Sequence, residues 1–412
     1  MTALDERSLT AAGHLVVPGF VDLHAHLREP GFEESETIAT GARAALRGGF
    51  VTVCAMANTE PPIDSPGLVA EVIARGAAAA AARVLPIATI TRGRRGHELA
   101  DLVELAAAGA VAFSDDGAPV EDARLFRSAL EYARACDHVL IEHPQDAALS
   151  AGGLMHEGRV SADLGLVGIP AASEETAVAR DLALAKLTGG RLHLTHLSTA
   201  GSLELVRRAK AGGLAVTCDV TPHHLCMTDE WVAGSRAFAW EENGDAKELR
   251  GAPFDASTKV NPPLRSRADA LALWRGVADG TVDAIATDHA PHASVRKEVE
   301  YDLAAFGISG LETALPLLLA GVAAGLAPLA RVIAALTSGP ARVLGIALEP
   351  DDRVVIDPRA EWTVSAQDLA SKGKNTPLLG RTLVGRVVMV VSSGKVRLDE
   401  RSGVAGTIVR AG

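Results

Sequence analysis

The sequence predicts an α/β protein built as a (β/α)8 TIM-type barrel, with a small β-sandwich-like domain formed by the two chain ends. Three observations support this prediction: eight short apolar runs end in polar residues, helical stretches separate these runs, and the pattern changes past residue 345. Eight consecutive parallel βα units close naturally into a barrel. A length of 412 residues is sufficient for such a barrel with one small domain beside it.

The stretches between the predicted strands have helical periodicity, as in residues 121–135 and 173–187. Ser173 and the pair Ser198–Thr199 stand where an N-cap is expected. A doubly wound open sheet is the alternative, but it would normally have a Gly-rich phosphate loop after its first strand, and none follows here. The predicted strands are residues 19–27, 49–58, 83–91, 109–117, 138–146, 191–199, 214–224 and 282–292.

The domain boundaries follow from the change of pattern near residue 345. Residues 352–364 and 381–398 alternate between apolar and polar side chains, as half-buried strands do. We therefore assign residues 18–344 to the barrel, 1–17 to the N-terminal segment of the small β domain and 345–412 to its C-terminal part. The first segment is too short for more than one or two strands, and we expect either that part of this domain is missing at that end or that the start site is placed late.

Composition and charge exclude several classes of protein. The net charge of -11 argues against nucleic acid as a partner, because neutralising phosphates requires a basic face. No apolar run is long enough for a membrane span, and no basic stretch precedes an apolar one as in a secretory signal. The four cysteines include no C-x-x-C pair, which suits a reducing compartment. We expect a soluble, cytoplasmic protein.

Residues of the types that bind metals stand at the ends of several predicted strands. His24 and His26 are two apart on one strand, so both side chains point to the same face. His143, His196 and Asp288 end the fifth, sixth and eighth strands. Taken singly, each histidine is more often an ordinary core residue, and a buried aspartate can be satisfied by hydrogen bonds. Because the carboxyl ends of barrel strands converge on one mouth, their coincidence favours a metal site there.

Two cations held close together need a bridging anion. Some two-metal barrels use a carboxylated lysine on the fourth strand, but the first lysine of this chain is Lys186, beyond the fifth strand. The end of the fourth strand instead offers Asp115 and Asp116. The period-two alternation of a strand does not choose between them at a strand end.

The order and spacing of these motifs resemble those of the class I dihydroorotases of the amidohydrolase superfamily. The resemblance covers about residues 18–400 and includes PGFVDLHAHLREPG, SDDG, EHPQD, HLS, NPPLRS and ATDHAPH. It implies two Zn²⁺ ions per subunit and the reversible hydrolysis of dihydroorotate to N-carbamoyl-L-aspartate in pyrimidine biosynthesis. It places one ion on His24, His26 and Asp288 and the other on His143 and His196, with Asp116 as the bridge. It also implies a homo-oligomer and leaves open an association with aspartate carbamoyltransferase.

The same resemblance implies a set of substrate-binding residues and a catalytic one. The planar guanidinium group of Arg28 suits the substrate carboxylate. Asp288 would accept a proton from the attacking water and then deliver it to the departing amide nitrogen. The residues implied to bind the substrate are His26, Arg28, Asn58, Asn261 and His292, with backbone groups of Phe306 and Gly307.

Three places depart from the family pattern. The usual M-P-N-T has Ala57 in place of proline, which should loosen the turn that presents Asn58. Gln145 stands where relatives commonly have an acidic residue, which should weaken the support of His143. Residues 237–258 form a longer segment than usual, and their charged, Gly-containing composition predicts an exposed loop near the mouth.

Two alternatives stay open beside a dihydroorotase. A hydantoinase or allantoinase would share the barrel and the metals, but neutral hydantoins have no carboxylate for Arg28 to bind. A catalytically silent scaffold for aspartate carbamoyltransferase would have no need of the metal-ligating residues. The remaining histidines are predicted to be structural: His193 and His289 should point away from the mouth, and we assign no role to the pair His223–His224.

Overall fold

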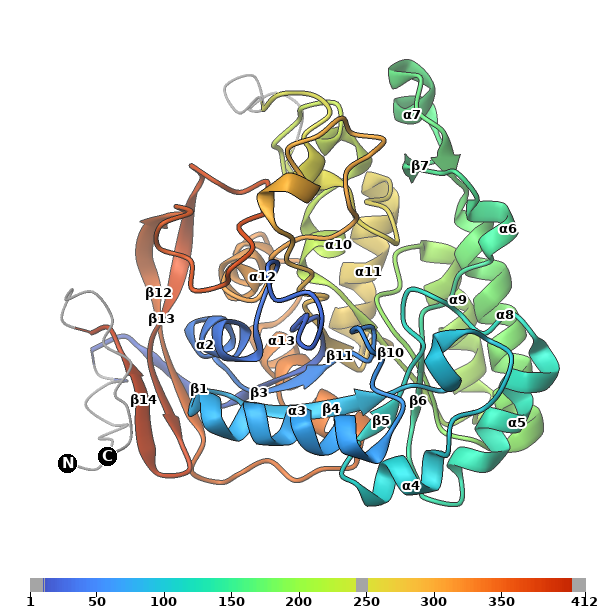
Figure 1. Ribbon diagram of the computed structural model, residues 1–412. Helices are drawn as coiled ribbons and strands as arrows, with labels where there is room; N and C mark the ends of the chain where they lie inside the picture. The colour runs from blue at the N-terminus through green and yellow to red at the C-terminus, as the bar shows by residue number, and fades with distance from the viewer. Residues whose placement is uncertain (1–9, 11, 242–250, 402–412) are drawn as a thin grey trace.

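The computed structural model describes residues 10, 12–241 and 251–401, and its largest sheet is an eight-stranded parallel barrel (Figure 1). The order of strands is β11-β10-β9-β6-β5-β4-β3-β2, and every strand lies inside one of the eight predicted runs. This confirms the predicted fold class. The barrel strands are β2 (Phe20–Ala25), β3 (Phe50–Ala55), β4 (Arg83–Ala88), β5 (Ala112–Phe113), β6 (Leu140–Glu142), β9 (Leu192–Leu194), β10 (Val216–Val220) and β11 (Ala284–Ile285).

The barrel closes between β2 and the segment after β11. The backbone N–H of His26 donates to the carbonyl of His289 at 2.8 Å, and Ala25 forms a parallel bridge with His289. Two residues earlier in that segment, Thr287 donates through its backbone N–H to Asp22 at 2.9 Å. Because these bonds join the first and last strands, residues more than 260 positions apart in the sequence reach the same rim of the barrel.

Local sequence signals explain where several helices begin and end. Thr37 caps α2 by accepting a hydrogen bond from the N–H of Thr40, and Gly49 ends the helix with a left-handed φ of 90°. The predicted cap of α9 is confirmed, since the Thr199 side chain accepts from the N–H of Ser202. The predicted cap Ser173 is wrong: α8 already begins at Ala171, after Pro170. A proline in the residue before the helix fits its missing N–H and fixed φ, and the helix therefore begins three residues earlier than predicted.

The helices mostly follow the strands and cover the outside of the barrel (Figure 1). They are α2 (Ile38–Gly48), α3 (Pro66–Ala79), α4 (Leu102–Ala107), α5 (Ala123–Ala133), α6 (Ala147–Ser150), α7 (Arg159–Leu164), α8 (Ala171–Thr188), α9 (Ala200–Ala211), α10 (Pro222–Cys226), α11 (Arg267–Asp279), α12 (Ala314–Ala323), α13 (Leu329–Leu336) and α14 (Ser338–Leu344). The 3-10 turns are η1 (Arg92–Arg94), η2 (Asp229–Trp231), η3 (Ala256–Thr258) and η4 (Ser294–Arg296). None of the helices in the described part of the chain is long and apolar enough to cross a membrane.

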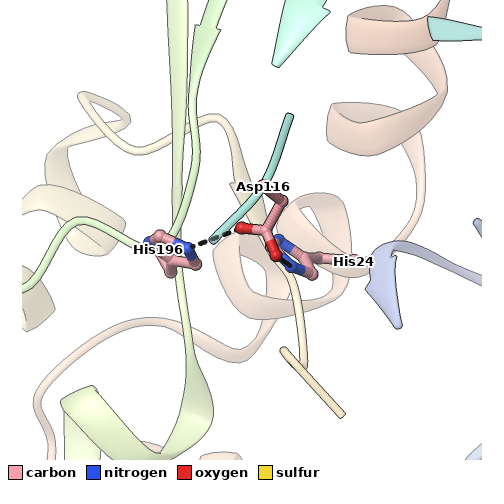
Figure 2. Close-up of side chains that lie close together, drawn as sticks. All are labelled: His24, Asp116 and His196. Carbon is pink, nitrogen blue, oxygen red and sulfur yellow. Dashed lines mark hydrogen bonds and ion pairs between the residues drawn. The ribbon is translucent and has the colours of Figure 1, made fainter. Parts of the chain in front are cut away.

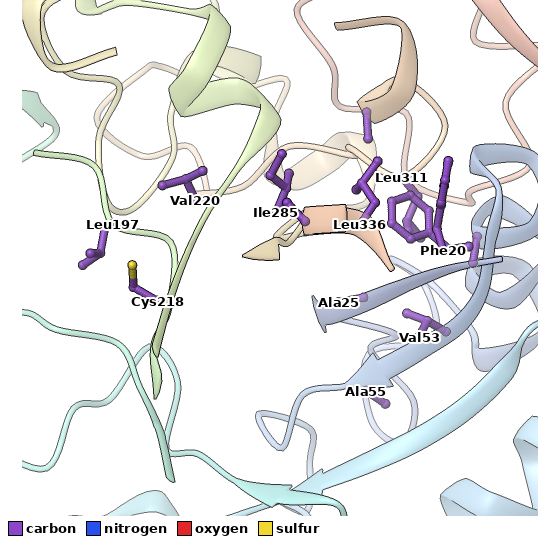
Figure 3. Close-up of a cluster of buried hydrophobic side chains, with 14 of the residues drawn as sticks. Phe20, Ala25, Val53, Ala55, Leu197, Cys218, Val220, Ile285, Leu311 and Leu336 are labelled. Carbon is purple, nitrogen blue, oxygen red and sulfur yellow. The ribbon is translucent and has the colours of Figure 1, made fainter. Parts of the chain in front are cut away.

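The hydrophobic core joins the strands to these helices. Figure 3 shows side chains of this core from β2, β3, β10 and β11 and from α13, including Val53, Ile285 and Leu336, all of them buried. The rings of Phe20 and Phe50 meet edge to face, with centroids 5.7 Å apart. The apolar residues of the strands are thus used for packing, which leaves the strand ends free for polar groups.

The chain ends form a separate four-stranded antiparallel sheet beside the barrel. Its order is β1 (Leu15–Pro18), β12 (Arg353–Thr363), β13 (Thr382–Ser392) and β14 (Lys395–Asp399). The last two strands are joined through Ser393 and Gly394, both with positive φ, as tight hairpin turns require. The sheet fits the predicted additional domain, while the boundaries at 17/18 and 344/345 stay a prediction.

Two further segments project from the barrel. A two-stranded parallel sheet of β7 (Met155–His156) and β8 (Gly168–Ile169) lies with α7 between β6 and α8 in the sequence. The segment 237–258 was predicted to be an exposed loop, and this is wrong for its first residues: Ala237, Phe238 and Ala239 are buried. Phe238 packs on Trp231 and under the guanidinium of Arg381, so aromatic packing outweighs the polar composition. Residues 242–250 lie outside the described residues.

Candidate metal centre and substrate pocket

The polar residues at the strand ends come together at the mouth of the barrel. His24 lies in β2 and His26 just beyond it; the others follow β5, β6, β9 and β11. All of these side chains are buried, although they are histidines and aspartates. Burying so many ionisable groups is costly unless they satisfy one another or bind an ion. The residues that meet are His24, His26, Asp116, His143, His196 and Asp288.

The first group consists of His24, His26 and Asp288. The carboxylate Oδ1 of Asp288 lies 3.1 Å from Nε2 of His26 and 3.5 Å from Nε2 of His24. One ligand atom from each of the three residues lies within 4.8 Å of the others. Two imidazole nitrogens and a carboxylate oxygen are a donor set typical of zinc and similar cations.

Asp116 lies between this group and the other two histidines. Its Oδ2 is 3.4 Å from Nε2 of His24, while its Oδ1 is 3.4 Å from Nδ1 of His143 and 3.4 Å from Nε2 of His196. Figure 2 shows the Asp116 carboxylate between the rings of His24 and His196. One carboxylate therefore faces both halves of the cluster, as a bridging ligand would.

The nitrogen atoms of the cluster fit bound cations. Nδ1 of His143 and Nε2 of His196 face each other at 2.9 Å, and Nε2 of His24 is buried without a hydrogen-bond partner among the described residues. Burial lowers the pKa of His24, but the charges of Asp116 and Asp288 outweigh this effect and raise it to about 10. Burial would raise the pKa of Asp116, but His24, His143 and His196 hold it well below its usual value. Charged carboxylate oxygens and imidazole nitrogens therefore converge on one point, as ligand atoms around cations do.

Neighbouring side chains fix the orientation of the histidine rings. Thr195 Oγ1 lies 2.9 Å from Nδ1 of His24, and Gln145 Oε1 lies 2.6 Å from Nε2 of His143. The backbone N–H of His196 donates to Asp219 at 2.6 Å. The ring contacts of His24 and His143 leave the opposite ring nitrogen free to face the centre of the cluster, whereas the bond to Asp219 holds only the backbone of His196.

The sequence missed Thr195 and Asp219, which have no motif of their own. Their only signal is their spacing from His196. Thr195 directly precedes His196, and Asp219 follows it by 23 residues, on the neighbouring strand. Gln145 was predicted to weaken the support of His143, yet its amide oxygen contacts that ring directly. The contact also joins the ring to Asn261, whose Nδ2 donates to the same Gln145 oxygen at 2.8 Å.

The two aspartates at the end of β5 have different environments. Asp115 accepts hydrogen bonds from the backbone N–H of Ile90 at 2.8 Å and of Thr91 at 3.2 Å, and from the Thr91 hydroxyl. Its carboxylate is therefore occupied by the neighbouring strand end, whereas Asp116 faces the histidines. The geometry supports Asp116 as the bridge that the sequence alone left open.

Known proteins resemble this chain over most of its length. The family model described as Dihydro-orotase-like matches residues 13–202. The dihydroorotase of Pelotomaculum thermopropionicum is 50% identical over 95% of this chain and 89% of its own length. The chain belongs to the dihydroorotase family. A dihydroorotase of Anaeromyxobacter dehalogenans is likewise 50% identical, over 96% of this chain and 89% of its own length. The fold is that of the L-hydantoinase (dihydropyrimidinase) of Arthrobacter aurescens, at a TM-score of 0.80 and 24% identity over 94% of this chain and 86% of that one.

Beside the cluster, this member of the family places Arg28 and His292 together. The guanidinium of Arg28 donates through Nε to the carbonyl of Pro291 at 3.2 Å, and its Nη2 lies 3.3 Å from Nε2 of His292. That ring nitrogen is also 2.8 Å from the carbonyl oxygen of Phe306. Within the described part of the chain no carboxylate pairs with Arg28, so its charge is available to an anion.

Asn58 and Asn261 approach the cluster from either side. Oδ1 of Asn58 lies 2.8 Å from Nδ1 of His26, so this residue orients a ring of the cluster, which the sequence did not predict. The amide nitrogen of Asn58 has no hydrogen bond to any other described residue. The replacement of proline by Ala57 was expected to loosen this turn, but Ala57 is buried and its carbonyl accepts from the N–H of Ile63 at 3.1 Å. The turn is therefore packed in place.

The backbone groups predicted to contact substrate are partly in use. The N–H of Gly307 donates to the carbonyl of Lys259 at 2.8 Å, and the carbonyl of Gly307 accepts from Asn375 at 2.9 Å. That Phe306 and Gly307 bind the substrate stays a prediction. In the free protein the backbone groups of Phe306 and Gly307 hold the segment beside His292 in place.

The other histidines lie outside the cluster. His193 contacts Asp219 at 2.8 Å, and His289 lies 3.4 Å from Glu36, so both are held by carboxylates away from the centre. His224 is held by Thr221 and the carbonyl of Pro262. His223 is buried, and its Nε2 has no hydrogen-bond partner in the described structure.

Proposed function

We propose that the protein is a zinc-dependent dihydroorotase that interconverts dihydroorotate and N-carbamoyl-L-aspartate. One observation supports this function above all: an unpaired Arg28 beside His292, next to a buried cluster of four histidines and two aspartates. The cluster fits a pair of cations, and the arginine fits the carboxylate that distinguishes this substrate from neutral cyclic amides.

The proposed metal centre uses His24, His26 and Asp288 for one ion and His143 with His196 for the other, with Asp116 facing both. Bound zinc ions would supply Lewis acidity and make water nucleophilic near neutral pH. The protein fixes the ring orientations through Thr195, Asn58 and Gln145. Two ions per subunit is part of this proposal.

The chain's own residues would bind and orient the ring. Arg28 would pair with the substrate carboxylate, and a charge-assisted contact of this kind contributes about 1.5–3 kcal/mol net. The free amide nitrogen of Asn58 and the ring of His292 lie near enough to Arg28 and His26 to act on the same group. Asn261, held by Gln145, would contact the substrate from the opposite side.

Asp288 would transfer the proton. Burial would raise the pKa of its carboxyl, but His26 and His24 outweigh burial and hold it below its usual value. The carboxylate is therefore ready to accept a proton from the attacking water, and it would then deliver that proton to the departing amide nitrogen. The cyclisation of N-carbamoyl-L-aspartate follows the same path in reverse.

A side-by-side assay tests this function. We expect the purified, zinc-loaded protein to hydrolyse dihydroorotate and to show little or no activity on hydantoin and allantoin. Preference for hydantoin or allantoin would indicate a related cyclic amide hydrolase instead. A well-folded protein that binds no zinc and turns over none of the three would favour a silent scaffold for aspartate carbamoyltransferase.

Assembly and location complete the proposal. We expect a homo-oligomer, which light scattering of the purified protein would measure, and the same experiment with added aspartate carbamoyltransferase would detect a complex. A cytoplasmic location fits a pyrimidine-biosynthesis enzyme and the four free cysteines, Cys54, Cys136, Cys218 and Cys226.

A further inference from the structure

Two lysines connect, through hydrogen bonds, the segments that form one wall of the substrate pocket. Lys259 precedes Asn261, and Lys297 lies in the segment between His292 and Phe306. Both are buried, with 2% and 7% of their surface exposed. Lysine is seldom buried to this extent without a carboxylate partner, so both positions require an explanation.

The contacts of the two lysines are reciprocal. Nζ of Lys297 donates to the carbonyls of Ala256 at 2.8 Å and Ala305 at 2.6 Å, and lies 3.5 Å from that of Lys259. Nζ of Lys259 donates to the carbonyl of Asp302 at 2.9 Å, in the segment that contains Lys297. Each ammonium group therefore bonds to the backbone of the other's segment.

Both segments lead directly to candidate substrate contacts. Ala305 is followed by Phe306, whose carbonyl contacts His292 and whose ring lies 4.6 Å from Nζ of Lys259. The N–H of Gly307 donates to the carbonyl of Lys259. A change in either lysine would therefore alter the positions of Asn261 and His292.

The positive charges of this wall have no ion-pair partner. Arg28, Lys259 and Lys297 form no ion pair with any carboxylate in the described ranges, and only more distant carboxylates act on Arg28 and Lys259. The carboxylate of Asp255, which acts on Lys297, is already paired with Arg236 at 2.8 Å. Burial and the charge of Lys259 lower the pKa of Lys297 to about 7, and Asp255 opposes this shift only in part. Cations without a direct partner favour an anionic ligand.

We propose that Lys259 and Lys297 are positioning residues that hold this wall and make the pocket selective for the more anionic of the two reactants. The inference rests on the proposed dihydroorotase function. Hydrolysis of the ring amide creates a second carboxylate, so N-carbamoyl-L-aspartate is a dianion and dihydroorotate a monoanion. Uncompensated positive charge stabilises a bound dianion more than a bound monoanion.

The test is to measure KM and kcat in both directions for Lys297→Met and Lys297→Arg, at a pH below 7. We expect Lys297→Met to raise KM for N-carbamoyl-L-aspartate about three- to tenfold more than KM for dihydroorotate, as expected for one lost charge in a poorly solvated site. Lys297→Arg, which keeps the charge, should restore most of the difference. Because the equilibrium constant is unchanged, the ratio of the two kcat values must shift by the same factor.

Lys210→Met is the matched control. Lys210 also donates to a backbone carbonyl, that of Thr281 at 2.6 Å, but at the opposite end of the barrel, before β11. This variant should leave both KM values unchanged. If Lys297→Met does not fold, as thermal unfolding would show, Lys259→Met is measured in the same way.

The possible outcomes distinguish the inference about the two lysines from the proposed dihydroorotase function. Equal changes of both KM values without rescue by arginine, or no change in either, would overturn the inference while the wild-type activity stands. A wild-type protein inactive on both reactants would instead overturn the proposed function.

Discussion

The mouth of the barrel and the sheet of the chain ends differ in the kind of side chain that they bury. At the mouth, buried side chains are ionisable, a nitrogen of His24 has no hydrogen-bond partner among the described residues, and Arg28, His196 and Asp288 all have positive φ. In the sheet, Val355 and Val390 are fully buried. The mouth therefore contains the buried cluster of ionisable groups, and the sheet contributes mainly apolar packing.

The difference indicates how a stable barrel can hold an unfavourable site. Non-glycine residues with positive φ and unpaired buried polar groups each cost free energy, typically on the order of 1–3 kcal/mol. Such costs are tolerated at the mouth because the strands and helices below it pack without them. We expect substitutions at the mouth to change turnover with small effects on stability, and substitutions in the sheet to do the reverse.

The largest effect should come from Asp288→Asn. The variant keeps the size of the side chain and one oxygen ligand but removes the proton acceptor, so kcat should fall by about a thousandfold, within the range for general acid–base groups. Kinetic assays with zinc content measured in parallel check this. Asp279→Asn, at the exposed end of α11, is the control and should be fully active. Full activity of Asp288→Asn with zinc bound would contradict its role.

The converse experiment is Ile356→Ala in the sheet. Ile356 on β12 is fully buried in the main hydrophobic cluster, and removing such a side chain leaves a cavity that costs about 2–5 kcal/mol of unfolding free energy. Urea unfolding measures this cost, and kcat/KM below the unfolding transition should match wild type. Val384→Ala on β13, 49% exposed, should cost far less. A large loss of kcat/KM in folded Ile356→Ala would contradict the expectation that the mouth determines turnover and the sheet determines stability.

The smallest effect concerns the pH dependence of stability. Burial lowers the pKa of Lys297 to about 7, against 10.5 in the unfolded chain, so between these values the unfolded state binds the extra proton. Stability should therefore rise with pH across this window, by at most about 1.4 kcal/mol per pH unit from this group. Urea unfolding at several pH values should show a flatter slope for Lys297→Met than for wild type or Lys210→Met. An identical slope would mean that burial does not lower the pKa of Lys297.

The amino-acid sequence was sufficient to predict the barrel, the separate sheet of the chain ends and the strand ends at which the candidate metal-ligating residues stand. These follow from local patterns: apolar runs of strand length, helical periodicity between them, and polar residues where each run stops. His24, His26, His143, His196 and Asp288 were accessible to this reasoning because parallel strands of a barrel all end at one rim.

The folded structure was needed to establish which groups face each other at that rim. It distinguished Asp116 from Asp115, turned Asn58 toward His26, moved the start of α8 away from Ser173 and paired Lys259 with Lys297. Each of these outcomes depends on hydrogen bonds between residues distant in the sequence or on side-chain directions at strand ends. Sequence periodicity ends where the strand does, so the direction of a side chain there is set by the neighbours it meets.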